Sequence, residues 1–173
     1  MTWTTRLRLV LLLVTTSVLQ ATLFPDLRFF EVAPDLGLVA TIAVAYRVGP
    51  DRGAVYGFAN GLAMDLFLQT PFGLSALTFA VVGYGVGVVQ GGMSRHVRFA
   101  APIFGGIGGV VGGFLFVAVA ALAGEEQVLV TRTLYVVLLA GVYDAVLAFA
   151  LFPAARWATR GAEAPVVRGA GSL

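Results

Sequence analysis

Two aspartates stand inside long apolar stretches of the sequence, where an acidic side chain is costly. Asp65 lies near the end of one such stretch and Asp144 lies well inside another. A carboxylate surrounded by hydrocarbon has to be paired, neutralised or hydrated. Acids in such positions are therefore candidates for ion or substrate binding, and the plainer interpretation, which we favour, is that they hydrogen-bond helices together.

The other residue types that carry chemistry are scarce. The chain has no cysteine and one histidine, which excludes disulfides, thiolate metal sites and histidine metal clusters. His96 stands beside Arg95 and Arg98, and we interpret it as an interfacial residue that contacts lipid headgroups. No nucleophile elbow, phosphate-binding glycine loop or metal-ligand spacing is present. We therefore expect no enzyme, no cofactor and no metal site, and a proton relay through two acids is only weakly indicated.

The composition of the chain indicates that the two aspartates belong to a membrane protein. The hydrophobic share of the 173 residues is 59% and the charged share is 12%, whereas about a quarter of a soluble domain is charged. A soluble chain of this length buries only part of its apolar surface. The solvent of most of this surface is therefore expected to be lipid.

Six apolar stretches approach the roughly 20 residues that a transmembrane helix needs, and Pro, Gly and Asp residues typical of turns separate them. Residues 1–157 are predicted to form one transmembrane domain, and residues 158–173 a disordered cytoplasmic tail. Leu19 and Ala21 make a poor cleavage pattern after the first stretch, so we expect an uncleaved anchor there and not a signal peptide. The predicted spans, of which the second is short for a full crossing, are 9–24, 36–46, 53–68, 74–89, 99–123 and 128–152.

The positions of the arginines predict how these spans are oriented in the membrane. With the amino terminus inside, nine of the eleven arginines fall in cytoplasmic segments, and the two outside are Arg28 and Arg132. This agrees with the positive-inside rule and predicts an all-α bundle of six transmembrane helices with both termini cytoplasmic. Asp65 and Arg132 then share the outer part of the membrane and are predicted to pair. Asp144 has no opposite charge at its depth, and we expect it to be protonated or hydrogen-bonded to a tyrosine or backbone group.

Glycines recur at helical spacing along the third, fourth and fifth stretches. In lipid, small residues let two helices approach closely, so packing within the chain is the favoured interpretation of these glycines. A face for another protein is the alternative, and the fifth stretch is its best candidate because so many glycines weaken a helix unless a neighbour packs on them. The glycines concerned are Gly53, Gly57, Gly61, Gly83, Gly87, Gly105, Gly106, Gly108, Gly109, Gly112 and Gly113.

The segment from Pro34 to Tyr84 resembles a known family. Residues 52–66 are Arg-Gly-Ala-Val-Tyr-Gly-Phe-Ala-Asn-Gly-Leu-Ala-Met-Asp-Leu, and residues 71–77 are Pro-Phe-Gly-Leu-Ser-Ala-Leu. This order is similar to the rod shape-determining protein MreD family, in which a Gly-Phe-x-x-Gly-Leu-x-x-Asp helix precedes a Gly-Leu-x-Ala-Leu helix. The positions that match the motif are Gly57, Gly61, Asp65 and Gly73.

The resemblance implies a scaffold or regulator of cell-wall elongation in the bacterial inner (plasma) membrane. It implies binding to the single-span protein MreC and action with the RodA glycosyltransferase and its penicillin-binding transpeptidase. It also implies a fold similar to the substrate-binding subunits of energy-coupling-factor vitamin transporters. The alternative function is such a small-molecule uptake subunit, with an outward cavity lined by Asn60, Asp65, Gln69, Thr70 and Arg132.

Overall fold

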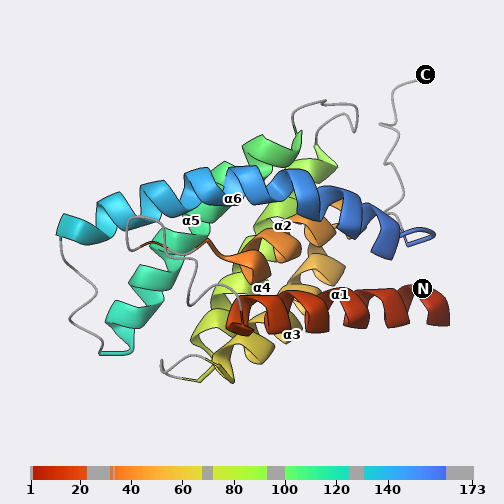
Figure 1. The fold of residues 1–173 in the computed structure, drawn as a ribbon, viewed down its shortest axis with the longest axis horizontal. Coiled ribbons are helices and arrows are strands. Elements are labelled where there is room, and N and C mark those ends of the chain that lie inside the picture. The colour runs from red at the N-terminus through yellow and green to blue at the C-terminus, as the bar shows by residue number, and fades with distance from the viewer. Residues whose placement is uncertain are drawn as a thin grey trace, which may run out of the picture.

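The described part of the chain forms six α-helices (Figure 1). The computed structural model describes residues 2–22, 32, 34–67, 72–92, 100–124 and 131–162. The helices are α1 (Trp3–Thr22), α2 (Leu36–Val48), α3 (Pro50–Asp65), α4 (Leu74–Gly91), α5 (Ala100–Leu122) and α6 (Thr131–Ala158).

Three of these helices, α4, α5 and α6, are long and apolar enough to cross a membrane. α2 is apolar but has only 13 residues, a length of about 20 Å against a hydrocarbon layer of about 30 Å. The first turns of α1 and α3 carry Arg6 and Arg52, which lowers the hydropathy of both helices. The prediction of six helices is confirmed and the membrane character is supported, while six complete crossings stay a prediction.

α1 and α6 extend furthest beyond the apolar stretches that predicted them. α1 begins at Trp3 and so contains both of its arginines, because arginine is a good helix former and does not end a helix. α6 continues past Pro153 to Ala158. Thr159 and Ala162, the latter 4% exposed, are buried after the helix ends, so the bundle includes the first part of the predicted tail. The rest of that tail lies outside the described residues.

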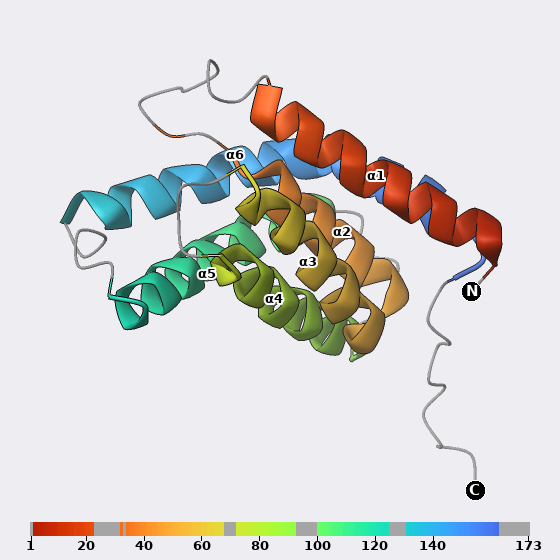
Figure 2. The same cartoon turned by 90° about the horizontal axis from the view of Figure 1, so that it is seen from below.

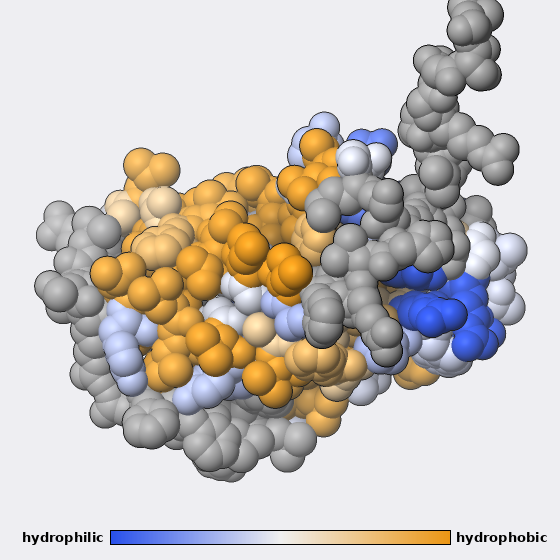
Figure 3. Space-filling model, turned by 90° about the horizontal axis from the view of Figure 1, so that it is seen from above, coloured by the Kyte–Doolittle hydropathy of each residue, from blue (hydrophilic) through white to orange (hydrophobic). Residues whose placement is uncertain are grey.

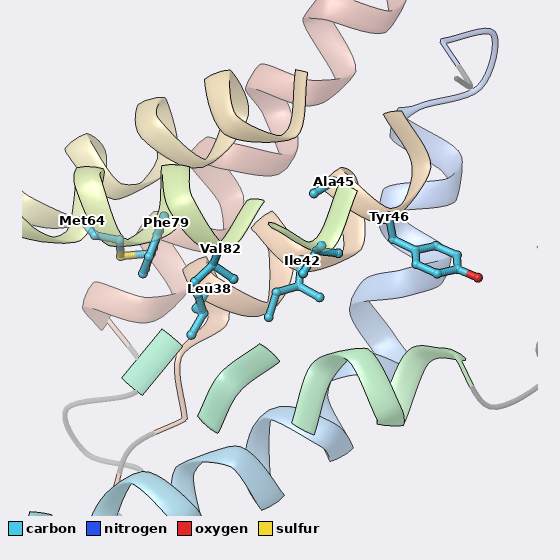
Figure 4. Close-up of a cluster of buried hydrophobic side chains, with 8 residues drawn as sticks. Leu38, Ile42, Ala45, Tyr46, Met64, Phe79 and Val82 are labelled. Carbon is cyan, nitrogen blue, oxygen red and sulfur yellow. The ribbon is translucent and has the colours of Figure 1, made fainter. Parts of the chain in front are cut away.

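α2 is the central helix of the bundle. Twelve of its thirteen residues are buried, and it packs against all five other helices. Its sequence is apolar all round, which is typical of a helix enclosed by others. Figure 4 shows one side of it, where Leu38 and Ile42 meet Phe79 and Val82 of α4.

Four of the other five helices form two closely packed pairs around α2. α3 lies on α4, and α5 lies on α6. In the α3–α4 pair the backbones themselves are in contact. A Cβ added at Gly53 would lie 2.8 Å from the carbonyl oxygen of Gly83, and one added at Gly83 would lie 2.5 Å from that of Gly53. The α5–α6 pair extends beyond the ends of the other helices on one side (Figure 2).

Arginines near the starts of α1 and α3 and at the end of α6 lie at the opposite end of the bundle. The Thr5 hydroxyl donates to the carbonyl oxygen of Arg160 at 3.3 Å, and Arg52 Nη1 donates to the carbonyl oxygen of Ala162 at 3.2 Å. These contacts join the start of α1, the start of α3 and the end of α6, and most of the strongly hydrophilic surface in Figure 3 lies toward one end. The assignment of the arginines to cytoplasmic segments stays a prediction.

Candidate functional site

Asp65 is the last residue of α3 and caps the start of α4. Its Oδ2 accepts the N–H of Gly73 at 2.9 Å and of Ala76 at 3.2 Å, and its Oδ1 accepts the N–H of Ser75 at 3.0 Å. The first N–H groups of a helix have no partner within the helix, and the helix dipole favours a negative charge beside them. The side chain is 4% exposed. Asp65 therefore closes the α3–α4 turn, where Gly73 adopts a positive φ of 97°.

This arrangement removes the reason for predicting that Asp65 pairs with Arg132. The pairing was inferred from the cost of leaving a buried carboxylate alone, and the three backbone N–H groups now supply hydrogen bonds to it. The side chain of Arg132 lies outside the described part of the structure, so the pairing itself stays untested.

The family-motif glycines lie on the same helix pair as Asp65. A Cβ at Gly57 would meet the backbone of Phe79, and a Cβ at Gly61 would meet the backbone of Ser75. Both substitutions would push α4 away from α3, since backbone atoms cannot rotate aside. Gly57, Gly61, Asp65 and Gly73 are thus one structural unit, which holds α3 and α4 together and starts α4.

Asp144 lies in the middle of α6 and meets the buried start of α2. Its Oδ1 accepts the N–H of Asp35 at 3.0 Å, and Asp35 Oδ1 in turn accepts the N–H of Leu38 at 2.9 Å. From α1, Gln20 Nε2 donates to the carbonyl oxygen of Pro34 at 3.1 Å, and Gln20 Oε1 accepts the N–H of Leu36 at 2.9 Å. We call Gln20, Asp35 and Asp144 the α2 junction.

The expectation that Asp144 bonds to a backbone group is confirmed. The sequence does not single out the other two members of the junction, because Asp35 lies just before the predicted span 36–46 and Gln20 is one polar residue inside the predicted span 9–24. The signal was the length of α2. A 13-residue helix is shorter than the hydrocarbon layer is thick, so one of its ends is expected to lie inside the bundle and to need polar partners there.

The glycines of α5 pack against other helices of the same chain. Gly105, Gly109 and Gly113 face α6, where an added Cβ would meet Ala148, Asp144 and Val137 respectively. Gly108 and Gly112 face Ile42 and Leu38 of α2, and Gly106 faces Ala145 and Gly141 of α6. Packing within the chain is the correct interpretation, and Gly105, Gly109 and Gly113 do not form a free face for a partner.

The geometry favours structural roles for both buried acids. The hydrogen bonds of Asp65 go to the start of α4 and that of Asp144 goes to the start of α2, so no described bond links the two acids into a relay. Within the described ranges, no three His, Asp or Glu side chains lie close enough together to hold a metal ion.

Comparison with known proteins does not extend this picture. No family model, curated protein or solved structure matches the chain. The resemblance to a known family therefore depends on the motif residues of α3 and α4.

Proposed function

We propose that this chain is a non-enzymatic membrane scaffold or regulator of the bacterial cell-wall elongation machinery. In this proposal it binds an MreC-like single-span protein and acts with RodA and a penicillin-binding transpeptidase. The observation that carries the proposal is the α3–α4 unit, where Gly57, Gly61, Asp65 and Gly73, the residues of the MreD-like motif, all have a packing or capping role.

The use of the interior polar groups supports a scaffold over an uptake subunit. Asn60 is fully buried, and its Nδ2 donates to the carbonyl oxygen of Gly37 at 2.7 Å and contacts the Thr41 hydroxyl at 3.2 Å. Asn60 and Asp65 were both expected to line the ligand cavity of an uptake subunit. Both instead bind backbone groups of neighbouring helices. The outer helix faces are left as the surface on which a protein partner acts.

One observation favours the alternative function. The α2 junction brings Gln20, Asp35 and Asp144 from three elements to one depth in the bundle, and convergence of polar groups at one depth is what a substrate-binding subunit requires. The side chains of the junction bond to backbone groups at the start of α2, which is why we rank this function second.

The test is co-purification with the candidate partner, combined with tryptophan substitutions on the outer faces. Val14, Val81, Ile107 and Val142 are exposed residues of α1, α4, α5 and α6. One of the four tryptophan variants is expected to lose the MreC-like anchor while its thermal unfolding in detergent is unchanged. The other three variants are the matched controls. Gly109 is unsuitable for this purpose, because a side chain there would meet Asp144.

Two outcomes would count against the scaffold. If the anchor protein never co-purifies, or if all four variants retain it, partner binding through a helix face is wrong. If the chain instead co-purifies with a pair of ATPase subunits, the uptake function replaces the scaffold.

A further inference from the structure

Three arginines lie near one tryptophan where α1 and α6 pack together. The guanidinium carbon of Arg8 lies 5.2 Å from the centre of the Trp157 ring, a distance at which a cation is attracted to the face of an aromatic ring. Arg156 and Arg160 flank Trp157 in sequence and are exposed. Arg156 lies in the last turn of α6 and Arg160 in the turn that directly follows Ala158, so both arginines lie at the end of α6 next to Trp157 in the chain.

This arrangement concentrates positive charge without a described counter-charge. Like charges that lie close together repel each other, and the start of α1 brings Arg8 to the end of α6 that carries Arg156 and Arg160. Asp51 is the acid that the structure describes at this end of the bundle, and it forms no described ion pair with Arg8, Arg156 or Arg160. A bound anion would remove this repulsion, and guanidinium groups bind phosphate through paired, charge-assisted hydrogen bonds.

The neighbouring surfaces are apolar, which favours a lipid over a soluble anion. On α6, Phe149 is 62% exposed and lies on the same face as Arg156, seven residues further along. On α1, Leu7 and Val10 are exposed beside Arg8. Trp157 is itself 41% exposed, as is common for tryptophan at a membrane interface. A phosphate held by the arginines would thus have apolar surface beside it for its acyl chains.

We propose that the ends of α1 and α6 form a binding site for the headgroup of an anionic phospholipid. Arg8, Arg156 and Arg160 are the phosphate ligands, and Trp157 holds Arg8 in place and lies at the level of the headgroup. The proposal is independent of the elongation function, because it uses no residue of the motif and no protein partner.

Native mass spectrometry of the detergent-purified chain tests the site, with dioleoyl phosphatidylglycerol, dioleoyl phosphatidylcholine and inorganic phosphate as the three probes. Phosphatidylglycerol is expected to bind at least about tenfold more tightly than phosphatidylcholine. The Arg156→Gln/Arg160→Gln variant is expected to lose at least about tenfold in affinity, since the loss of a single charge-assisted hydrogen bond already corresponds to about tenfold. Arg6→Glu lowers the net charge by the same amount at the same end, at an exposed position with no described side-chain contact, and is the matched control.

Several results would overturn the site. Equal binding of the two lipids, or an equal loss in the glutamine variant and the Arg6→Glu control, would show that only general charge attraction acts here. Tight binding of inorganic phosphate would show a site for a soluble anion. If the glutamine variant unfolds, Arg156→Lys/Arg160→Lys replaces it, since lysine keeps the charge but lacks the paired donors. An undiminished affinity in a folded lysine variant would contradict phosphate binding by these guanidinium groups.

Discussion

Replacing Asp65 by alanine is the most direct test of how α3 and α4 are joined. The substitution removes acceptors from the N–H groups of Gly73, Ser75 and Ala76, two of which belong to the buried first turn of α4. Removing a helix cap usually costs up to about 2 kcal/mol, and a hydrogen bond to a charged group contributes about 1.5–3 kcal/mol. Because three bonds share one carboxylate and do not add fully, we expect Asp65→Ala to lower the free energy of unfolding by about 3 kcal/mol.

Asp65→Asn refines this test. An amide has one oxygen, which can keep the two bonds now made by Oδ2, while its NH2 group would face the N–H of Ser75. The expected loss is therefore intermediate, about 1–2 kcal/mol. Asp51→Asn is the matched control, because Asp51 is an exposed acid in the first turn of α3, where loss of charge costs no more than about 1 kcal/mol.

The assay is reversible unfolding of the purified chain in mixed micelles of increasing denaturing-detergent content, followed by circular dichroism. The expected order of stability is wild type, then Asp65→Asn, then Asp65→Ala, with Asp51→Asn close to wild type. If Asp65→Ala costs less than about 1 kcal/mol, the three hydrogen bonds do not hold the start of α4 as described. An Asp65→Asn variant that is less stable than Asp65→Ala would refute the bond-by-bond reasoning.

Three further predictions concern the α3–α4 contact, the α2 junction and the orientation of the chain in the membrane. Gly83→Ala is expected to destabilise the chain because its Cβ would meet the backbone of α3, whereas Gly85→Ala, which has open space, should stabilise α4 by about 0.5–1 kcal/mol; equal effects in thermal unfolding would contradict the backbone contact. Asp144→Asn should keep the bond from the Asp35 N–H, whereas Asp144→Ala should lose about 1–3 kcal/mol in the same assay; equal losses would show that charge and not this bond matters. The chain has no cysteine, so in intact cells Ala123→Cys should react with an impermeant maleimide and Thr2→Cys should not; the reverse result would invert the orientation.

The sequence predicted the helices and their charged end well, because both depend on local composition. Apolar runs define where helices form, and the arginines near the starts of α1 and α3 and at the end of α6 lie at one end because charged side chains avoid the apolar layer. Arg8 and Arg160 are an example of this gathering of charge, because they are far apart in sequence and lie at the same end of the bundle.

The roles of individual helices were harder to predict, because they depend on which faces meet. Four-residue glycine spacing shows that a helix has a close neighbour but does not identify it. Gly109 could therefore be assigned to a partner protein as easily as to Asp144 of the same chain. The same limit applied to Asp35, whose place in the interior follows only once α2 is known to be enclosed by the other helices.

Both intramembrane candidates turn out to serve the same purpose, the capping of a helix that starts inside the bundle. The first turn of a helix exposes N–H groups that water would satisfy at a protein surface, and in an apolar layer a side chain has to supply the acceptors. Asp65 does so for α4, and Asp144 does so for the residue that precedes α2. An acid in an apolar segment is often taken to mark an ion or substrate pathway. A short or turn-flanked helix nearby, such as the 13-residue α2, points instead to a structural cap. Contacts with a partner are therefore expected on the outer faces of the helices and not at the buried acids.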